Sequence, residues 1–83
     1  GVCPVMVDPE FRRRFQVGRE VHDARGELRN LDGRRTTLET RLRDAKTDED
    51  RRRIRDELIG LDRDMSRARD RLRDAERNLD RMR

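Results

Sequence analysis

The sequence has 83 residues, of which 30% are hydrophobic and 51% are charged, and two phenylalanines are its only Phe, Tyr or Trp residues. This composition excludes a globular domain built around a sizeable core, and no apolar run approaches the ~20 residues of a membrane-spanning helix. Two possibilities remain: a disordered chain, or long helices that bury one narrow apolar stripe.

The charge balance is basic, with 23 Lys and Arg against 19 Asp and Glu and a net charge of +4. Acidic residues interrupt the basic ones along most of the chain, and unbroken runs of three arginines occur only at 12–14 and 51–53. A continuous stripe that could follow a phosphate backbone is therefore not evident. A basic helical nucleic-acid-binding protein that uses these two runs stays as an alternative function.

Residues 1–8 are expected to form an extended lead-in, since Pro4 biases Cys3 toward an extended backbone. Three apolar residues without local cover follow: Val5, Met6 and Val7. The single cysteine cannot form an intrachain disulfide, so Cys3 is a free thiol or pairs with a cysteine outside this chain. Because the chain opens with Gly1 rather than Met, we expect a fragment or a processed product.

A first helix is predicted over residues 9–46. Asp8 is a good N-cap, Pro9 suits the first helical position, and Glu10 favours the positive end of the helix dipole. Apolar or small residues then recur in alternating steps of four and three, interrupted once by Arg35: Val17, Val21, Ala24, Leu28, Leu31, Leu38, Leu42 and Ala45. This spacing is that of a heptad seam.

The seam is interrupted after Ala45, because the next apolar seam residue, Ile54, lies nine residues further on where a continuous heptad needs seven. The intervening stretch contains a helix start, in which Thr47 can cap a helix whose first turn holds three acidic residues. We therefore predict a hairpin turn with its N-cap at 47–49 and a second helix over 50–83.

A second seam follows with the same alternating steps: Ile54, Leu58, Leu61, Met65, Ala68, Leu72, Ala75, Leu79 and Met82. When the chain reverses near Asp48, residues whose numbers sum to 96 face each other, so that Leu38 meets Leu58 and Leu31 meets Met65. Every layer then sets an a position against a d position. We predict an all-α antiparallel two-helix coiled-coil hairpin; one long helix that forms parallel dimers is the alternative.

Charges beside the seam agree with this pairing on one edge, where three predicted pairs are complementary: Glu27–Arg71, Arg34–Asp64 and Arg41–Glu57. On the other edge Glu39–Arg55 is complementary, but two predicted pairs are like-charged: Arg25–Arg69 and Asp32–Asp62. Arg35 occupies an a position and is either a polar specificity device or a side chain whose stem packs. We expect packing, with the guanidinium reaching an acidic neighbour: Asp32, Asp62 or Glu39.

Catalysis and metal binding find little support, because a two-helix hairpin offers no cleft to perturb its carboxylates and His22 has no second His or Cys nearby. We predict a protein that is not an enzyme and has no cofactor. The candidate partner-binding residues are apolar and lie off the seam: Val5, Met6, Val7, Phe11, Phe15 and Ile59. All except Ile59 gather at the open end of the hairpin, where we expect another protein or a second copy to dock.

Four glycines also lie off the predicted seam: Gly18, Gly26, Gly33 and Gly60. Each costs about 1 kcal/mol in a helix interior relative to alanine. They either permit the close approach of another helix or soften the hairpin.

The opening segment contains a Gly-x-Cys-Pro motif followed by Phe-x-x-x-Phe-x-x-Gly-Arg, with the residues Gly1, Cys3, Pro4, Phe11, Phe15, Gly18 and Arg19. These motifs resemble the closing part of domain-of-unknown-function family number 2799, found in proteobacterial envelope lipoproteins. Members are similar in having a Cys-rich N-terminal region before these motifs and a charged helical tail after them.

This resemblance implies a periplasmic protein held at the membrane only by a lipid anchor upstream of this chain. It also implies that Cys3 pairs with an upstream cysteine in that oxidising compartment. Apart from the resemblance, a cytoplasmic location is open. The expected function is a protein-interaction or structural coiled-coil module of the cell envelope that binds or neutralises a partner protein.

Overall fold

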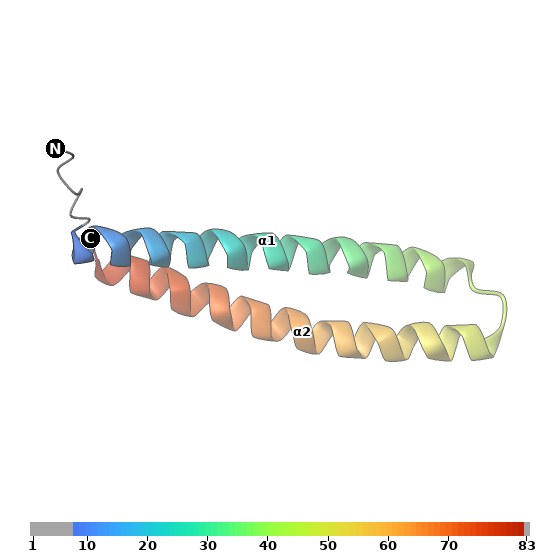
Figure 1. Ribbon diagram of the computed structural model, residues 1–83. Helices are drawn as coiled ribbons and strands as arrows, with labels where there is room; N and C mark the ends of the chain where they lie inside the picture. Colours follow the sequence, from blue (N-terminus) through green and yellow to red (C-terminus); the bar gives the residue numbers. More distant parts are fainter. Residues whose placement is uncertain (1–7, 83) are drawn as a thin grey trace, which may run out of the picture.

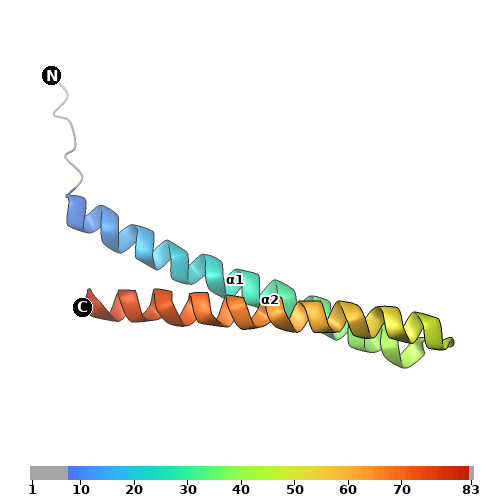
Figure 2. The same ribbon diagram turned by 90° about the horizontal axis from the view of Figure 1, so that it is seen from below.

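The computed structural model describes residues 8–82 of the chain. They form two α-helices, α1 over Pro9–Asp44 and α2 over Asp48–Arg81, which run antiparallel along each other (Figure 1 and Figure 2). The predicted all-α helical hairpin is confirmed, and the alternative of one continuous helix is wrong. At about 1.5 Å per residue, each helix is roughly 50 Å long.

The start of α1 is fixed by its first residues. The backbone N–H of Glu10 donates a hydrogen bond of 3.1 Å to Oδ1 of Asp8, the N-cap, and Pro9 occupies the first turn. The backbone N–H of Arg12 donates to the carbonyl oxygen of Asp8 at 3.0 Å, which closes the first helical turn. The rest of the predicted lead-in, residues 1–7, lies outside the described part of the chain.

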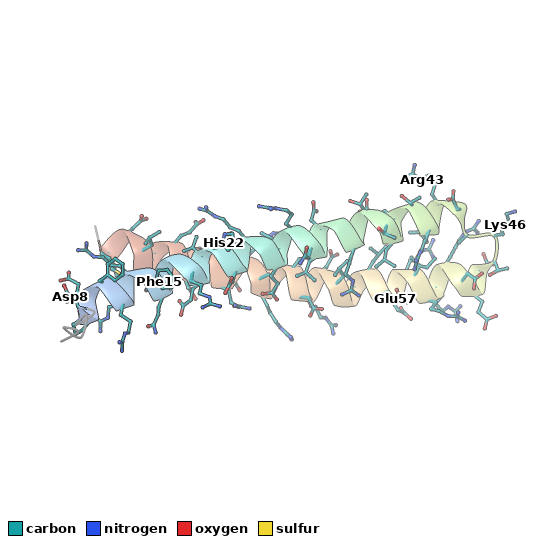
Figure 3. All side chains as sticks on the ribbon, turned by 45° about the horizontal axis from the view of Figure 1, so that its top comes forward. Asp8, Phe15, His22, Arg43, Lys46 and Glu57 are labelled. Carbon is teal, nitrogen blue, oxygen red and sulfur yellow. The ribbon has the colours of Figure 1, made fainter. Side chains whose placement is uncertain are left out.

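The end of α1 differs from the prediction by two residues, since the helix ends at Asp44 rather than at Lys46. Ala45 is extended, with φ −64° and ψ 132°, and its N–H donates to the carbonyl oxygen of Leu42 at 3.3 Å. An extended residue is needed here because two antiparallel helices cannot be joined by continued helical backbone. Lys46 consequently lies in the turn (Figure 3), and Arg41 and Arg43 are the basic residues of the last helical turn.

Thr47 caps α2, as its sequence context predicts. Its backbone is extended, and its Oγ1 accepts a hydrogen bond of 3.1 Å from the backbone N–H of Asp50. The helix therefore begins at Asp48, two residues before the predicted start. All three acidic residues of this region lie in the first turn of α2, where they interact favourably with the positive end of its dipole.

The core is the seam between the helices. The buried residues all belong to the two predicted seams: Val21, Ala24, Leu31 and Leu38 of α1, with Leu61, Met65, Ala68 and Ala75 of α2. Five of them form one packed cluster, Leu31, Leu38, Leu61, Met65 and Ala68, against which Leu28, Ile54 and Leu58 pack while partly exposed. The hydrophobic stabilisation of the hairpin therefore comes from this single stripe.

On one edge of the seam, one of the three predicted charge pairs is confirmed, Glu27–Arg71, whereas Arg34 and Asp64 form no ion pair within residues 8–82. Nη1 of Arg71 lies 2.6 Å from Oε2 of Glu27, the shortest ion pair between the helices in residues 8–82. Arg41 and Glu57 line a common groove but form no ion pair in that range. The charges on this edge therefore help to define which residues of the two helices face each other. They add little stability, since exposed ion pairs contribute only about 0–1 kcal/mol.

On the other edge, Arg25 was predicted to face Arg69, but it forms an ion pair with an acidic residue further along α2 instead. Nη2 of Arg25 lies 3.2 Å from Oε1 of Glu76, which is two turns of α2 beyond Arg69. The long arginine side chain can reach this diagonal neighbour without any change in the backbone register.

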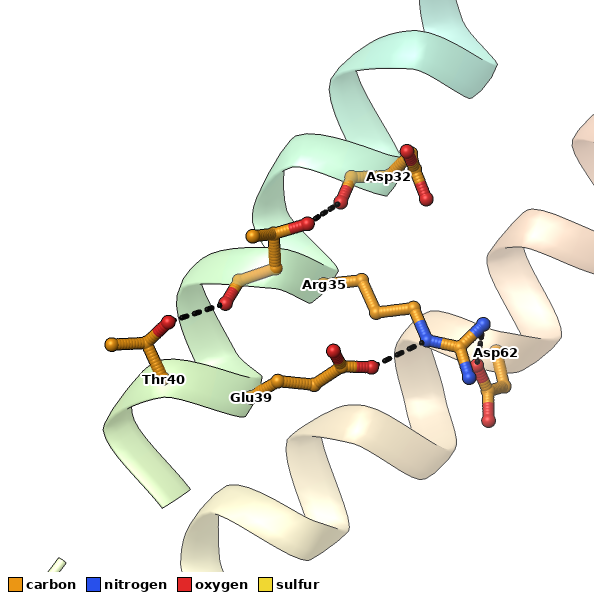
Figure 4. Close-up of polar contacts among 6 residues, drawn as sticks. Asp32, Arg35, Glu39, Thr40 and Asp62 are labelled. Carbon is orange, nitrogen blue, oxygen red and sulfur yellow. Dashed lines mark hydrogen bonds and ion pairs between the residues drawn. The ribbon is translucent and has the colours of Figure 1, made fainter. Parts of the chain in front are cut away.

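Arg35 behaves as the packing hypothesis expects. Its side chain is half-buried, its Nε lies 3.1 Å from Oε1 of Glu39, and its Nη1 lies 3.5 Å from Oδ1 of Asp62 (Figure 4). Asp62 is thereby paired with a cation, and the predicted like-charge contact between Asp32 and Asp62 is relieved. The positive charge that interrupts the seam at Arg35 is therefore paired with acidic residues of the hairpin itself.

Replacing Leu38 by alanine is expected to lower the free energy of unfolding by about 2–4 kcal/mol, because this side chain lies inside the packed cluster. Leu58→Ala should cost less, since Leu58 is only half-buried. Urea denaturation followed by circular dichroism measures both, with exposed Ile59→Ala as the control. An unchanged denaturation midpoint for Leu38→Ala would show that the seam is paired differently.

The cap of α2 provides a second test. Thr47→Ala removes the acceptor for the Asp50 N–H and should cost about 1 kcal/mol of stability, whereas Thr47→Ser should retain most of it. Thr37→Ala is the matched control, because that exposed threonine lies in the interior of α1, where its hydroxyl donates to the Gly33 carbonyl oxygen at 3.1 Å and caps no helix end. Equal effects of Thr47→Ala and Thr37→Ala would contradict the capping role.

Candidate functional site

The large apolar side chains exposed on the described chain are Phe11 and Phe15, each 63% exposed, and Ile59, 54% exposed. Phe11 and Phe15 are four residues apart in α1, so their side chains lie on the same face one turn apart. Phe15 and the N-cap Asp8 both lie toward the open end of the hairpin (Figure 3). We call Phe11 and Phe15 the aromatic pair.

The aromatic pair is exposed because the seam ends before it. The seam positions at this level hold Glu10 and Arg14, which form an ion pair of 3.2 Å with each other instead of packing on α2. Val17, the nearest apolar seam residue, is already half-exposed. At 3.6 residues per turn, the aromatic pair faces about 100° away from the seam, so α2 cannot cover it.

Ile59 does not join the aromatic pair. It lines a groove near the turn with Arg52, Arg55 and Asp56. In the predicted pairing it lies at the level of residue 37, which is 22 residues or about 33 Å along the hairpin from Phe15. The remaining predicted docking residues, Val5, Met6 and Val7, lie outside the described residues, as does Cys3.

The two basic runs lie at opposite ends of the hairpin. Arg12–Arg14 belongs to the first turns of α1, and Arg51–Arg53 to the first turns of α2 beside the turn. Each run already donates to an acidic neighbour, since Arg14 pairs with Glu10 and Arg51 with Asp48 at 3.3 Å. The fold therefore does not bring these six arginines together into one surface that could bind an anion.

Within residues 8–82 no group of three or more His, Cys, Asp or Glu side chains is placed to hold a metal ion. His22 is exposed on α1 (Figure 3). Neither α1 nor α2 includes a stretch apolar and long enough to span a membrane.

The off-seam glycines have no packing role inside the hairpin. A Cβ atom added at any of the four would meet no atom within 4 Å in the structure: Gly18, Gly26, Gly33 and Gly60. Close approach between α1 and α2 therefore does not explain them. Alanines buried to 1% exposure, Ala24 and Ala68, supply the small residues of the seam instead.

Sequence reasoning did not identify a groove of about 380 Å³ along the edge of the seam where Arg25 meets Arg69. Its floor is formed by Leu28, Met65 and Leu72, and its rim by Arg25, Arg29, Arg69 and Asp32. The like-charge pair predicted at this edge was the available signal. A heptad pattern alone does not show that such a pair borders an open apolar surface. We call this feature the arginine groove.

Comparisons with known protein families, curated proteins and solved structures find no match to this chain. Its function is therefore argued from the aromatic pair, the grooves and the charges of the hairpin, and the resemblance of the opening motifs to envelope lipoproteins stays an expectation.

The open space at the glycines leads to a prediction. Gly33→Ala should raise the free energy of unfolding by about 1 kcal/mol, because alanine has the higher helix propensity and its methyl group meets no neighbour here. Thermal denaturation at several protein concentrations measures the effect. A lower melting temperature would indicate that another helix packs on this face in solution.

Proposed function

We propose that this chain is a non-enzymatic protein-interaction module that docks through the aromatic pair at the open end of the hairpin. The observation that carries the proposal is the 63% exposure of both Phe11 and Phe15 on a face that α2 cannot cover. Burying one phenylalanine side chain fully contributes about 1.5–3 kcal/mol. Two adjacent rings therefore offer a partner a contact comparable with the hot spots of protein interfaces.

The rest of the hairpin suits a spacer that presents this contact. The helices hold the aromatic pair about 50 Å from the turn. The grooves found on residues 8–82 are open to solvent along the seam. Substrates are normally bound where most of their surface is covered, so the geometry favours binding of a protein over catalysis.

We place the module in the bacterial cell envelope, on the periplasmic side, as part of a protein anchored by a lipid upstream of this chain. The support for this location is the resemblance of the Gly-x-Cys-Pro and Phe-x-x-x-Phe-x-x-Gly-Arg motifs to those of the envelope lipoprotein family. Its partner is another protein, which it binds or neutralises, or a second copy of itself.

Phe11→Ala/Phe15→Ala tests the docking surface. We expect the wild-type chain to self-associate, because no residue in the range 8–82 covers the rings, and the double variant to associate at least tenfold more weakly. Sedimentation equilibrium over a range of concentrations measures both. Ile59→Ala, which removes an apolar side chain that is 54% exposed and far from the open end, should associate like the wild type.

Two results would contradict this proposal. Equal association of the double variant and the wild type would exclude the aromatic pair as the contact. A wild-type chain that stays monomeric at about 1 mM would exclude the second copy as the partner. A gel shift with random DNA at about 50 mM salt checks the competing nucleic-acid function, for which we expect no binding.

A further inference from the structure

The arginine groove departs from the charge pattern of the other grooves. Two other grooves hold more acidic than basic residues in their linings, one near the turn and one toward the open end. Two more, lined by Arg34, Arg41 and Glu57 and by Arg51, Arg52, Arg55, Asp48 and Asp56, have one arginine in excess. The arginine groove instead has three arginines against the single carboxylate of Asp32. Positive charge is therefore concentrated where the seam exposes its apolar side chains.

Two of the three arginines form no ion pair within the described residues. Arg25 is paired with Glu76, but neither Arg29 nor Arg69 forms an ion pair with any residue in the range 8–82. Both are exposed, and they come from different helices on opposite sides of the groove. A partner's carboxylate placed beside either guanidinium would therefore form an ion pair in which no residue of the range 8–82 already takes part.

The floor of the groove is apolar. Met65 is buried, but Leu28 and Leu72 are half-buried and complete the floor from α1 and α2. These leucines cannot be covered further by the hairpin, because both helices already meet beneath them. An occupant that gains from this floor must carry an apolar side chain as well as a carboxylate.

We infer that the arginine groove binds an acidic amphipathic helix of a partner protein. An apolar side chain of that helix packs on Leu28, Met65 and Leu72, and carboxylates one turn away on either side bind Arg29 and Arg69. Arginine suits this role because its planar guanidinium binds a carboxylate through two parallel hydrogen bonds. The inference goes beyond the contact proposed for the aromatic pair, since it concerns a separate surface and names the chemistry of its partner.

The shape of the groove favours a helix over a small anionic ligand. Small-molecule sites cover 70–90% or more of a typical ligand, and an open groove along two helices cannot do so. A third helix lying along the groove brings its own covering surface. A second copy of this chain is a poor occupant, because an isologous contact centred on the groove would set Arg29 and Arg69 against the same arginines of the other copy.

The experiment uses the full chain and a labelled synthetic peptide of about 14 residues, with leucines spaced three and four apart and glutamates flanking them. Fluorescence anisotropy at about 50 mM salt measures its Kd. We expect the Arg29→Gln/Arg69→Gln variant to bind at least tenfold more weakly than the wild type. Arg63→Gln/Arg67→Gln is the matched control, because it removes the same charge from exposed positions of α2 outside the groove and should bind like the wild type.

Three outcomes would overturn the inference: no binding of the acidic peptide to the wild type, an equal loss in both double variants, or equal binding of a peptide with lysines in place of the glutamates. Circular dichroism of each variant checks that the hairpin is folded. Phe11→Ala/Phe15→Ala should leave the Kd unchanged, since a peptide of this length bound at the groove does not reach the open end. Loss of binding there would assign the peptide to the aromatic pair and not to the groove.

Discussion

The burial of one apolar seam against the other is the interaction on which the hairpin depends. Half of the residues are charged, so neither helix can bury its stripe except against its partner. The packed cluster around Leu38 and Met65 provides most of the available hydrophobic stabilisation. Everything else is arranged around this contact: the Thr47 cap reverses the chain so that the seams face each other, and the Glu27–Arg71 ion pair reports the same register.

The seam, the reversal of the chain and the Glu27–Arg71 ion pair could be predicted because they follow from local spacing and capping residues. Periodicity decides which face of a helix is apolar, and an N-cap decides where the next helix begins. The ion pair between Arg25 and Glu76 could not be predicted, because the heptad pattern placed Arg25 beside Arg69. Which neighbour a long side chain reaches depends on how the two helices cross. The early end of α1 at Asp44 reflects the backbone needed to join two helices, which the heptad does not encode.

Of the two candidate surfaces, the sequence predicted the aromatic pair but not the arginine groove, again because periodicity shows only which face of a helix is apolar. The aromatic pair is visible in the sequence as two apolar residues out of phase with the seam, and Glu10 and Arg14 at the seam positions explain why α2 leaves it uncovered. The arginine groove is not visible in this way. Its floor consists of ordinary seam residues, and only their incomplete burial beside Arg29 and Arg69 distinguishes it.

The two proposed contacts lie on the same side of the hairpin. Phe11 and Phe15 are each 14 residues, or two heptads, before Arg25 and Arg29, so the four side chains follow one stripe along α1 with about 21 Å between the pairs. Gly18 lies on this stripe between them, with open space where a side chain would project. The exposed His22 also lies on this stripe, one heptad after Phe15. A partner helix longer than the test peptide would therefore pass over Gly18 and His22 and contact the aromatic pair and the groove together. Linking the two contacts in one partner raises the effective concentration at the second, so a longer acidic helix ending in apolar residues should bind more tightly than the sum of its separate halves suggests.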